Sequence, residues 1–312
     1  MRALITGGAG FVGSHLAAVL QARGVQVRVL DNFRTGHRRN LAGCDVELNE
    51  GSILDVSLRE QTMVGVDHVF HLAEVVSVPE SVAQPWVCVD LNVVGLLNVL
   101  EATAAAGVKK LCFASSAAIY GDNPAVPKVE AMRPEPRSPY AVTKLDGKYC
   151  CAQFTQSGRL EAVALRYFTV FVPRQDPACA YAAAVPIFMS QALVHQPLTI
   201  YGDGGQIRDF VYVQDVVTAN TFAATTPGLT GVYNVGYGGQ ITVLELAQRI
   251  ARLADSRSEI RHTTARAGDV RNSRAGVDSL HTAGFRPVSS LAPGLVETLD
   301  HFRKQVPDPS TP

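Results

Sequence analysis

A glycine-rich segment near the start of the chain constrains the fold more than any other feature. Thr6-Gly7-Gly8-Ala9-Gly10-Phe11-Val12-Gly13 follows a short apolar run, Ala3–Ile5, and opens an amphipathic pattern over Phe11–Ala22. The glycines permit a tight turn and let the backbone approach a pyrophosphate, which then lies at the positive N-terminus of a helix. The segment therefore predicts a strand–turn–helix unit that binds a pyrophosphate.

The first half of the chain alternates short β-branched runs with helical patterns, which is typical of βαβ units and a parallel sheet. Further strands are expected at Val25–Leu30, Val46–Leu48, Val66–His71, Lys110–Ala114 and Ala162–Tyr167, and long helices at Val87–Ala106 and Pro139–Gln156. We predict an α/β fold: a Rossmann-type, doubly wound parallel sheet followed by a smaller C-terminal α+β substrate domain.

Asp31 ends the second predicted strand, at the position where a carboxylate would accept hydrogen bonds from an adenosine ribose. A negative charge there would repel the 2′-phosphate of NADP, so NAD is favoured. Arg34, Arg38 and Arg39 follow closely in the sequence, and their positive charges could accommodate the 2′-phosphate, so NADP stays an alternative.

The length of 312 residues allows two domains. Pro- and Gly-punctuated elements begin after about Pro173. We assign residues 1–172 to an NAD-binding domain, to which residues of about 207–238 return. Residues 173–303 would form mainly the substrate domain, and 304–312 a frayed tail.

Composition narrows the class of partner. The chain has 28 basic and 28 acidic residues, which argues against nucleic acid or anionic membrane as its main partner. Neither a membrane-spanning run nor a secretory signal is evident, the histidines have no metal-ligand spacing, and the six cysteines resemble buried thiols of a reducing compartment. We expect a cytoplasmic protein without a metal.

Two segments carry the candidate chemistry. Ser115 and Ser116 end an apolar strand, where an open parallel sheet places its ligands, and Tyr140 and Lys144 are four residues apart and share one helical face. An ammonium near a phenol favours the phenolate and is expected to lower its pKa. Such a tyrosine could take a proton from a sugar hydroxyl.

Together these motifs resemble those of extended short-chain dehydrogenases/reductases, and within that superfamily the chain is similar to UDP-sugar 4-epimerases. The matching stretches are Thr6–Leu16, Asp31-Asn32, His71-Leu72-Ala73, Ser81, Asn92–Gly95, Ser115–Gly121, Ser138–Lys144, Leu165–Phe168, Leu198–Asp203, Arg208–Val211, Tyr233–Gly236 and Gly268–Arg271.

The resemblance implies a redox-neutral isomerase with tightly bound NAD. Tyr140 would remove the proton of the sugar 4-hydroxyl while the C4 hydride passes to NAD, and Ser116 would hydrogen-bond the same oxygen. Lys144 would hold the nicotinamide ribose and tune Tyr140. The 4-keto sugar would then turn over and be reduced on its other face.

The resemblance also implies two sets of binding residues. The NAD site would comprise Gly7, Gly10, Phe11, Val12, Gly13, Asp31, Asn32, Ser52, Ile53, Leu72, Ala73, Asn92, Ser115, Tyr140, Lys144 and Phe168. The UDP-sugar site would comprise Ser116, Tyr140, Thr169, Thr199, Tyr201, Arg208, Arg266, Asp269 and Ser273. In the second set, the two arginines would bind the diphosphate.

Departures from the family pattern refine the activity. Dehydratases and decarboxylases of the superfamily carry acidic residues after the strand-end serines, and this chain has Ala117 and Ala118. Ser273, in place of a bulky tyrosine, would leave room for an N-acetyl group. We therefore expect a 4-epimerase of UDP-glucose/UDP-galactose and of UDP-GlcNAc/UDP-GalNAc.

Alternatives remain. Thr169 resembles the UDP-glucuronate 4-epimerases, although Asp176 stands where those enzymes have an arginine. Another nucleotide-sugar oxidoreductase that releases NADH, or a cofactor-binding scaffold without catalysis, would also fit parts of the pattern. Val172 replaces a glycine, and Glu74 adds a carboxylate near the nicotinamide side. Apolar surface on the two long helices predicts a homodimer.

Overall fold

A seven-stranded sheet organises the first part of the molecule in the computed structural model, which describes residues 1–171, 173–175, 184–265 and 270–304. Its strands are all parallel and lie in the order β11-β6-β5-β4-β1-β2-β3. The strands are β1 (Arg2–Thr6), β2 (Gln26–Asp31), β3 (Val46–Glu50), β4 (His68–His71), β5 (Lys110–Ser116), β6 (Glu161–Tyr167) and β11 (Gly231–Val235). Strand order reverses between β1 and β4, and this topology confirms the doubly wound α/β prediction.

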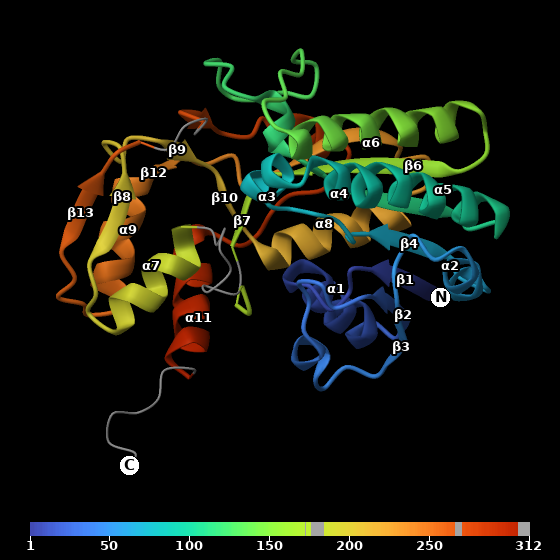
Figure 1. Cartoon of the computed structure of the whole chain (residues 1–312), viewed down its shortest axis with the longest axis horizontal. Coiled ribbons are helices and arrows are strands. Elements are labelled where there is room, and N and C mark those ends of the chain that lie inside the picture. Colours follow the sequence, from blue (N-terminus) through green and yellow to red (C-terminus); the bar gives the residue numbers. More distant parts are fainter. Residues whose placement is uncertain (172, 176–183, 266–269, 305–312) are drawn as a thin grey trace.

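Helices cover both faces of this sheet (Figure 1). On one face, α1 (Phe11–Ala22) and α8 (Val213–Thr225) pack together and share a core that contains Leu16, Leu20 and Val217. On the other face, α2 (Val56–Met63), α5 (Gly95–Ala105) and α6 (Pro139–Gln156) contribute to a second core. Burial on both faces explains why the strands are nearly continuous apolar runs.

A smaller lobe contains short mixed sheets and lies at the left of Figure 1. Two of these sheets have two strands, β10-β7 and β13-β8, and the third has three strands in the order β12-β9-β14. The remaining elements are η1 (Arg38–Leu41), α3 (Val78–Ala83), η3 (Ala117–Tyr120), β7 (Thr169–Phe171), α7 (Ala184–Leu193), β8 (Leu198–Tyr201), β9 (Ile207–Arg208), β10 (Phe210–Tyr212), β12 (Ile241–Thr242), α9 (Val243–Leu253), β13 (Ile260–Thr263), β14 (Asn272–Ser273), α10 (Asp278–Thr282) and α11 (Leu291–Arg303).

Two predicted helices, α1 and α6, have the expected bounds. α6 begins there because the Ser138 side chain accepts a hydrogen bond from the backbone N–H of Ala141, and Pro139 occupies the first turn. The predicted helix Val87–Ala106 is instead divided into α4 (Pro85–Val89), the π-helical segment η2 (Asp90–Val94) and α5. Among the described residues, only Pro85–Ala105 has the length and composition of a membrane-spanning helix, and it packs into the core through Leu96 and Val99.

The carboxyl ends of the strands bring the sequence motifs to one edge of the sheet. Thr6, Asp31, His71 and Ser116 end β1, β2, β4 and β5 respectively. Since these strands are parallel neighbours in one sheet, the glycine loop and the strand-end serines face the same crevice.

Candidate active site

The glycine loop has the geometry that a pyrophosphate requires. Gly10 is the N-cap of α1 and no side chain caps the helix there, so its first N–H groups point outward. Gly7 has a positive φ of 73°, and a Cβ at this position would meet the backbone nitrogen of Ala73 at 2.7 Å. A Cβ on Gly13 would collide with the carbonyl oxygen of Gly7. Because Gly7 and Gly13 have no side chain, the backbone of the loop can pack closely and its N–H groups remain accessible to a pyrophosphate.

Asp31 is tied to the same loop. Its Oδ2 accepts a hydrogen bond from the backbone N–H of Ala9 at 2.8 Å, and its Oδ1 accepts one from Phe33 at 2.8 Å. The side chain is buried at the end of β2. Each carboxylate oxygen retains a second lone pair, so Asp31 can also accept from a ribose hydroxyl.

Two of the three nearby arginines have acidic partners. Arg34 forms an ion pair with Glu80, and Arg38 pairs with Glu50 while its guanidinium lies 4.4 Å from the centre of the Phe33 ring. These contacts compete with binding of a 2′-phosphate. They strengthen the case for NAD over NADP at this carboxylate-lined strand end.

The remaining predicted NAD residues surround the same crevice. Leu72 and Ala73 follow β4 and donate backbone hydrogen bonds to Thr6, while the buried Ile53 packs against Gly95. Ser115 has a buried hydroxyl without a hydrogen-bond partner in the described part of the chain. A dinucleotide would find three complementary features here: the unpartnered Ser115 hydroxyl, the uncapped N-terminus of α1 and the glycine loop. The other members of the set are Phe11, Val12, Asn32, Ser52, Asn92 and Phe168.

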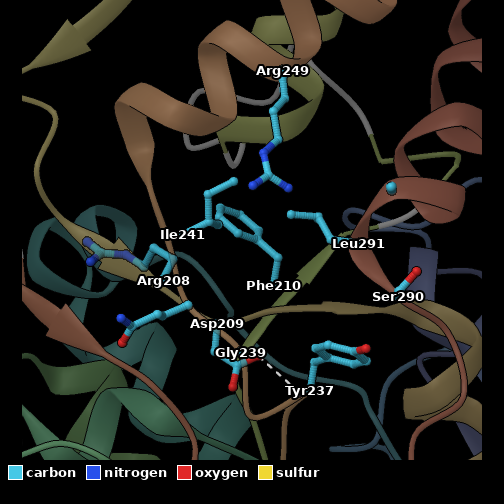
Figure 2. Close-up of a pocket in the computed structure, with 11 residues that line it drawn as sticks. Arg208, Asp209, Phe210, Tyr237, Gly239, Ile241, Arg249, Ser290 and Leu291 are labelled. Atoms are coloured by element: carbon cyan, nitrogen blue, oxygen red, sulfur yellow. Dashed lines mark hydrogen bonds between the residues drawn. The ribbon is translucent and has the colours of Figure 1, made fainter.

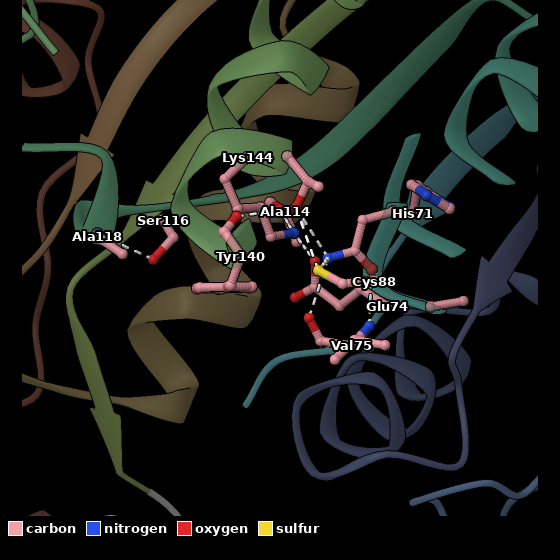
Figure 3. A network of polar contacts seen from close by, with 12 residues as sticks. His71, Glu74, Val75, Cys88, Ala114, Ser116, Ala118, Tyr140 and Lys144 are labelled. Carbon is pink, nitrogen blue, oxygen red and sulfur yellow. Dashed lines mark hydrogen bonds and ion pairs between the residues drawn. The ribbon is translucent and has the colours of Figure 1, made fainter. Parts of the chain in front are cut away.

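Ser116, Tyr140 and Lys144 meet at the carboxyl end of β5 (Figure 3). The Ser116 side chain is close enough to the Tyr140 phenol to favour its ionised form, and Ser116 Oγ accepts a hydrogen bond from the backbone N–H of Ala118 at 3.1 Å. Lys144 Nζ lies 5.7 Å from the centre of the Tyr140 ring and donates to the carbonyl oxygen of Ala114. The structure therefore brings Ser116, Tyr140 and Lys144 together at the carboxyl end of β5.

The electrostatics differ from the simple expectation. Burial raises the pKa of Tyr140 to about 12, although the Ser116 side chain opposes this shift. Lys144 is not among the groups that shift this pKa, and its ammonium forms a buried ion pair with Glu74. Glu74 stands out in the sequence as a carboxylate near the nicotinamide side, but its pairing with Lys144 is visible only in the fold.

Ala117 and Ala118 begin η3 directly beside Ser116. Neither methyl group can donate or accept a proton. These two positions beside Ser116 therefore contribute no acid or base.

Three predicted substrate residues lie on short strands of two small sheets. Arg208 in β9 is paired in register with Ser273 in β14, and the backbone N–H of Thr169 in β7 donates to the carbonyl of Asp209 at 3.0 Å. The Arg208 guanidinium donates to the carbonyl of Val270 at 2.7 Å. Thr199 and Tyr201 lie together on β8, which pairs with β13. Arg266, Asp269, Val172 and Asp176 lie outside the described residues.

A hollow of about 270 Å³ in the smaller lobe has Arg208 and Asp209 among its lining residues (Figure 2). The Arg249 side chain extends from α9 towards Phe210 and Leu291, whereas the Arg208 guanidinium points in another direction. The lining includes none of Ser116, Tyr140 and Lys144. This hollow is therefore separate from the catalytic trio.

Comparison with known proteins agrees with this geometry. Residues 3–236 match the NAD dependent epimerase/dehydratase family. A UDP-glucose 4-epimerase from Thermus thermophilus, solved in complex with NAD, is 39% identical with a TM-score of 0.91 over 98% of this chain and 100% of that one. A UDP-N-acetylglucosamine 4-epimerase from Methanobrevibacter ruminantium, in complex with UDP-N-acetylmuramic acid, is 35% identical with a TM-score of 0.94 over 97% and 98%.

Relatives with other activities are about as similar. A UDP-N-acetyl-alpha-D-glucosaminuronate decarboxylase from Bacillus cytotoxicus is 34% identical over 97% of this chain and 98% of its own length. Overall similarity thus identifies an NAD-dependent enzyme that modifies nucleotide sugars, and the choice among reactions depends on individual site residues.

Proposed function

The chain belongs to the NAD-dependent epimerase/dehydratase family, and from that premise we propose that it is a UDP-hexose 4-epimerase. The observation that carries this proposal is the meeting of Ser116, Tyr140 and Lys144 at the end of β5, where Ala117 and Ala118 directly follow Ser116. The site thus has a group for proton transfer at one sugar hydroxyl. It lacks, at these two positions, the further acid or base needed for dehydration.

In the proposed reaction, Tyr140 takes the proton of the sugar 4-hydroxyl, and Ser116 hydrogen-bonds the same oxygen. NAD, when bound, supplies the hydride acceptor and donor at C4. Lys144 orients the nicotinamide ribose from α6. The same Tyr140 returns the proton after the 4-keto sugar has turned over, so the reaction is redox-neutral.

Within the crevice, we propose that the glycine loop binds the pyrophosphate of NAD and that Asp31 accepts from its adenosine ribose. Residues 1–172 together with 207–238 would form the NAD-binding domain, and 173–303 mainly the substrate domain. Arg208, with Arg266 and Asp269, would bind the nucleotide half of the substrate. We further propose that the enzyme acts in the cytoplasm.

For the sugar, we propose that both UDP-glucose/UDP-galactose and UDP-GlcNAc/UDP-GalNAc are accepted. Ser273 is a small side chain paired in register with Arg208, so space beside the diphosphate-binding strand is not filled by an aromatic ring. The similarity to a UDP-N-acetylglucosamine 4-epimerase supports this choice.

The direct test is an NMR assay of the purified enzyme without added cofactor, with UDP-glucose, UDP-GlcNAc and UDP-glucuronate in separate reactions. A C4-inverted product from the neutral sugars would support the proposal, and Tyr140→Phe should reduce that rate by at least about 10²-fold. Inversion of UDP-glucuronate alone would contradict the sugar assignment. A net 4-keto product formed only with added NAD would contradict the redox-neutral cycle.

We also propose a homodimer that forms through one helical face. Apolar side chains are exposed on α3, the α4–α5 helical run and α6, which lie on the same side of the sheet in Figure 1: Val82, Trp86, Leu97, Val142 and Tyr149. Trp86 is 79% exposed, which is unusual for a large aromatic side chain. Light scattering of the wild type and of Val142→Glu would test whether this face joins two copies.

A further inference from the structure

Lys144 has a partner that the motif around it does not require. Its ammonium contacts the carboxylate of Glu74 and the carbonyl oxygen of Ala114, and it lies 4.7 Å from the centre of the Phe113 ring. The side chains of Lys144 and Glu74 are only 1% and 12% exposed. Water therefore screens this pair weakly, and its charges act strongly on neighbouring groups.

The fold fastens Glu74 in this place. The Asn92 side chain accepts from the backbone N–H of Val75 at 2.8 Å and donates to its carbonyl at 3.0 Å. Asn92 also donates to Thr143 Oγ1 at 3.1 Å, one residue before Lys144 in α6. One buried amide thus joins the segment that follows Glu74 to α6. Glu74 and Lys144 are both drawn in Figure 3.

His71, Cys88 and Cys151 do not supply a competing charge to the pair near neutral pH. Burial lowers the pKa of His71, on β4, to about 3, and raises the pKa values of the Cys88 and Cys151 thiols on α4 and α6. Burial also lowers the pKa of Lys144 itself, whereas the contacting carboxylate favours its charged form. Glu74 is therefore the counter-ion that the described surroundings offer to Lys144.

We propose that Glu74 is a positioning residue that binds and neutralises the Lys144 ammonium, keeps Tyr140 in its phenol form and moves the working range of the site to higher pH. The effect of Glu74 on the pH dependence of turnover rests on the proposed function, whereas its effect on the Tyr140 proton does not.

The first test measures the Tyr140 proton without using activity. Tyrosinate absorbance is titrated in the protein as purified, with its NAD content measured. Because the chain has nine tyrosines, each titration is repeated in the Tyr140→Phe background and subtracted. Replacing Glu74 by glutamine should lower the Tyr140 midpoint by about one pH unit or more, the scale expected when a cation near an acid loses its counter-ion. Glu74→Ala should lower it in the same direction.

A matched control removes the same charge elsewhere. Glu259→Gln breaks an exposed pair with Arg261 beside β13 and should leave the midpoint unchanged. An unchanged or higher midpoint in both Glu74 variants would overturn the proposal. If only one variant folds, its midpoint decides alone.

The second test measures the pH dependence of kcat for inversion at C4. Its acidic limb should move to lower pH in Glu74→Gln by about the same amount as the Tyr140 midpoint. A lower midpoint without any epimerase activity in the wild type would retain the role of Glu74 and contradict the proposed function. Epimerase activity with an unmoved midpoint would retain the function and contradict the role of Glu74.

Discussion

Asp31 Oδ2 accepts the backbone N–H of Ala9 at 2.8 Å, and this contact joins the end of β2 to the glycine loop after β1. A second hydrogen bond, from the N–H of Phe33 to Oδ1 at 2.8 Å, fixes the rotation of the carboxylate. The residue that would discriminate between ribose and ribose phosphate also shapes the pyrophosphate loop. Cofactor choice and loop order are therefore coupled through one side chain.

Changing Asp31 to Asn should weaken NAD binding and reduce the preference for NAD over NADP. The amide cannot accept on both sides as the carboxylate does, and the repulsion of a 2′-phosphate is lost. We expect NAD affinity to fall at least about tenfold, since a hydrogen bond to a charged group contributes about 1.5–3 kcal/mol. Calorimetric titration of wild type and variant with NAD and with NADP would measure the two affinities. Exposed Asp45→Asn is the control for charge, and equal loss there would contradict a specific role.

Gly13→Ala should impair cofactor binding more than Gly10→Ala. A Cβ on Gly13 would collide with the Gly7 carbonyl, whereas one on Gly10 would lie 3.2 Å from the same oxygen. The loop must shift in the first variant and needs only a small adjustment in the second. The fraction of protein that retains NAD through desalting would compare them. Equal retention in both variants would show that the loop tolerates the added methyl group.

Much of the fold follows from local sequence signals. The Ser138 cap and Pro139 define the start of α6, and the apolar run before Ser115 predicts the strand that delivers Ser116 to the sheet edge. Spacing within one helix then brings Tyr140 and Lys144 together. These features depend on residues close in sequence, which is why the trio could be predicted.

Other features depend on contacts between distant segments. Glu74 follows β4, whereas Lys144 lies on α6, which packs against β5, the neighbour of β4 in the sheet. No local pattern encodes their contact. The π-helical turn within the predicted helix Val87–Ala106 accompanies the hydrogen bonds that Asn92 makes with Val75 and Thr143. The register of Ser273 with Arg208 likewise joins two strands that are too short to recognise from alternation.

Ser273→Tyr should narrow the proposed sugar range. The added ring would extend beside β9, in the space assigned to the substituent on C2 of the sugar. We expect turnover of UDP-GlcNAc to fall by about tenfold or more relative to UDP-glucose, because the larger N-acetyl group competes with the ring for space. The ratio of kcat/KM values for the two substrates measures this effect. Ser273→Ala is the control, and an unchanged ratio in Ser273→Tyr would place the C2 substituent elsewhere.

Asp209 provides a stability test with a defined pH window. Burial raises the pKa of its carboxyl to about 6, although hydrogen bonds from the N–H groups of Tyr237, Ala275 and Gly238 oppose this shift. The folded protein therefore holds this proton more tightly than the unfolded chain. Its contribution to stability is fully present below about pH 4, the unfolded pKa, and is lost as pH rises through about 6.

Asp209→Asn removes this titration and should be most destabilising at low pH. The difference in unfolding free energy between wild type and variant should shrink by about 2 kcal/mol from pH 4 to pH 7, because the pKa differs by roughly two units and the unfolded carboxyl is still about half protonated at pH 4. Urea unfolding at both pH values measures it, and taking the difference cancels the opposite contribution of the buried His15 and His71, whose pKa values are lowered. A destabilisation that is the same at pH 4 and pH 7 would mean that Asp209 is ionised in the folded protein throughout this range. Its three hydrogen bonds would then outweigh the cost of burying its charge.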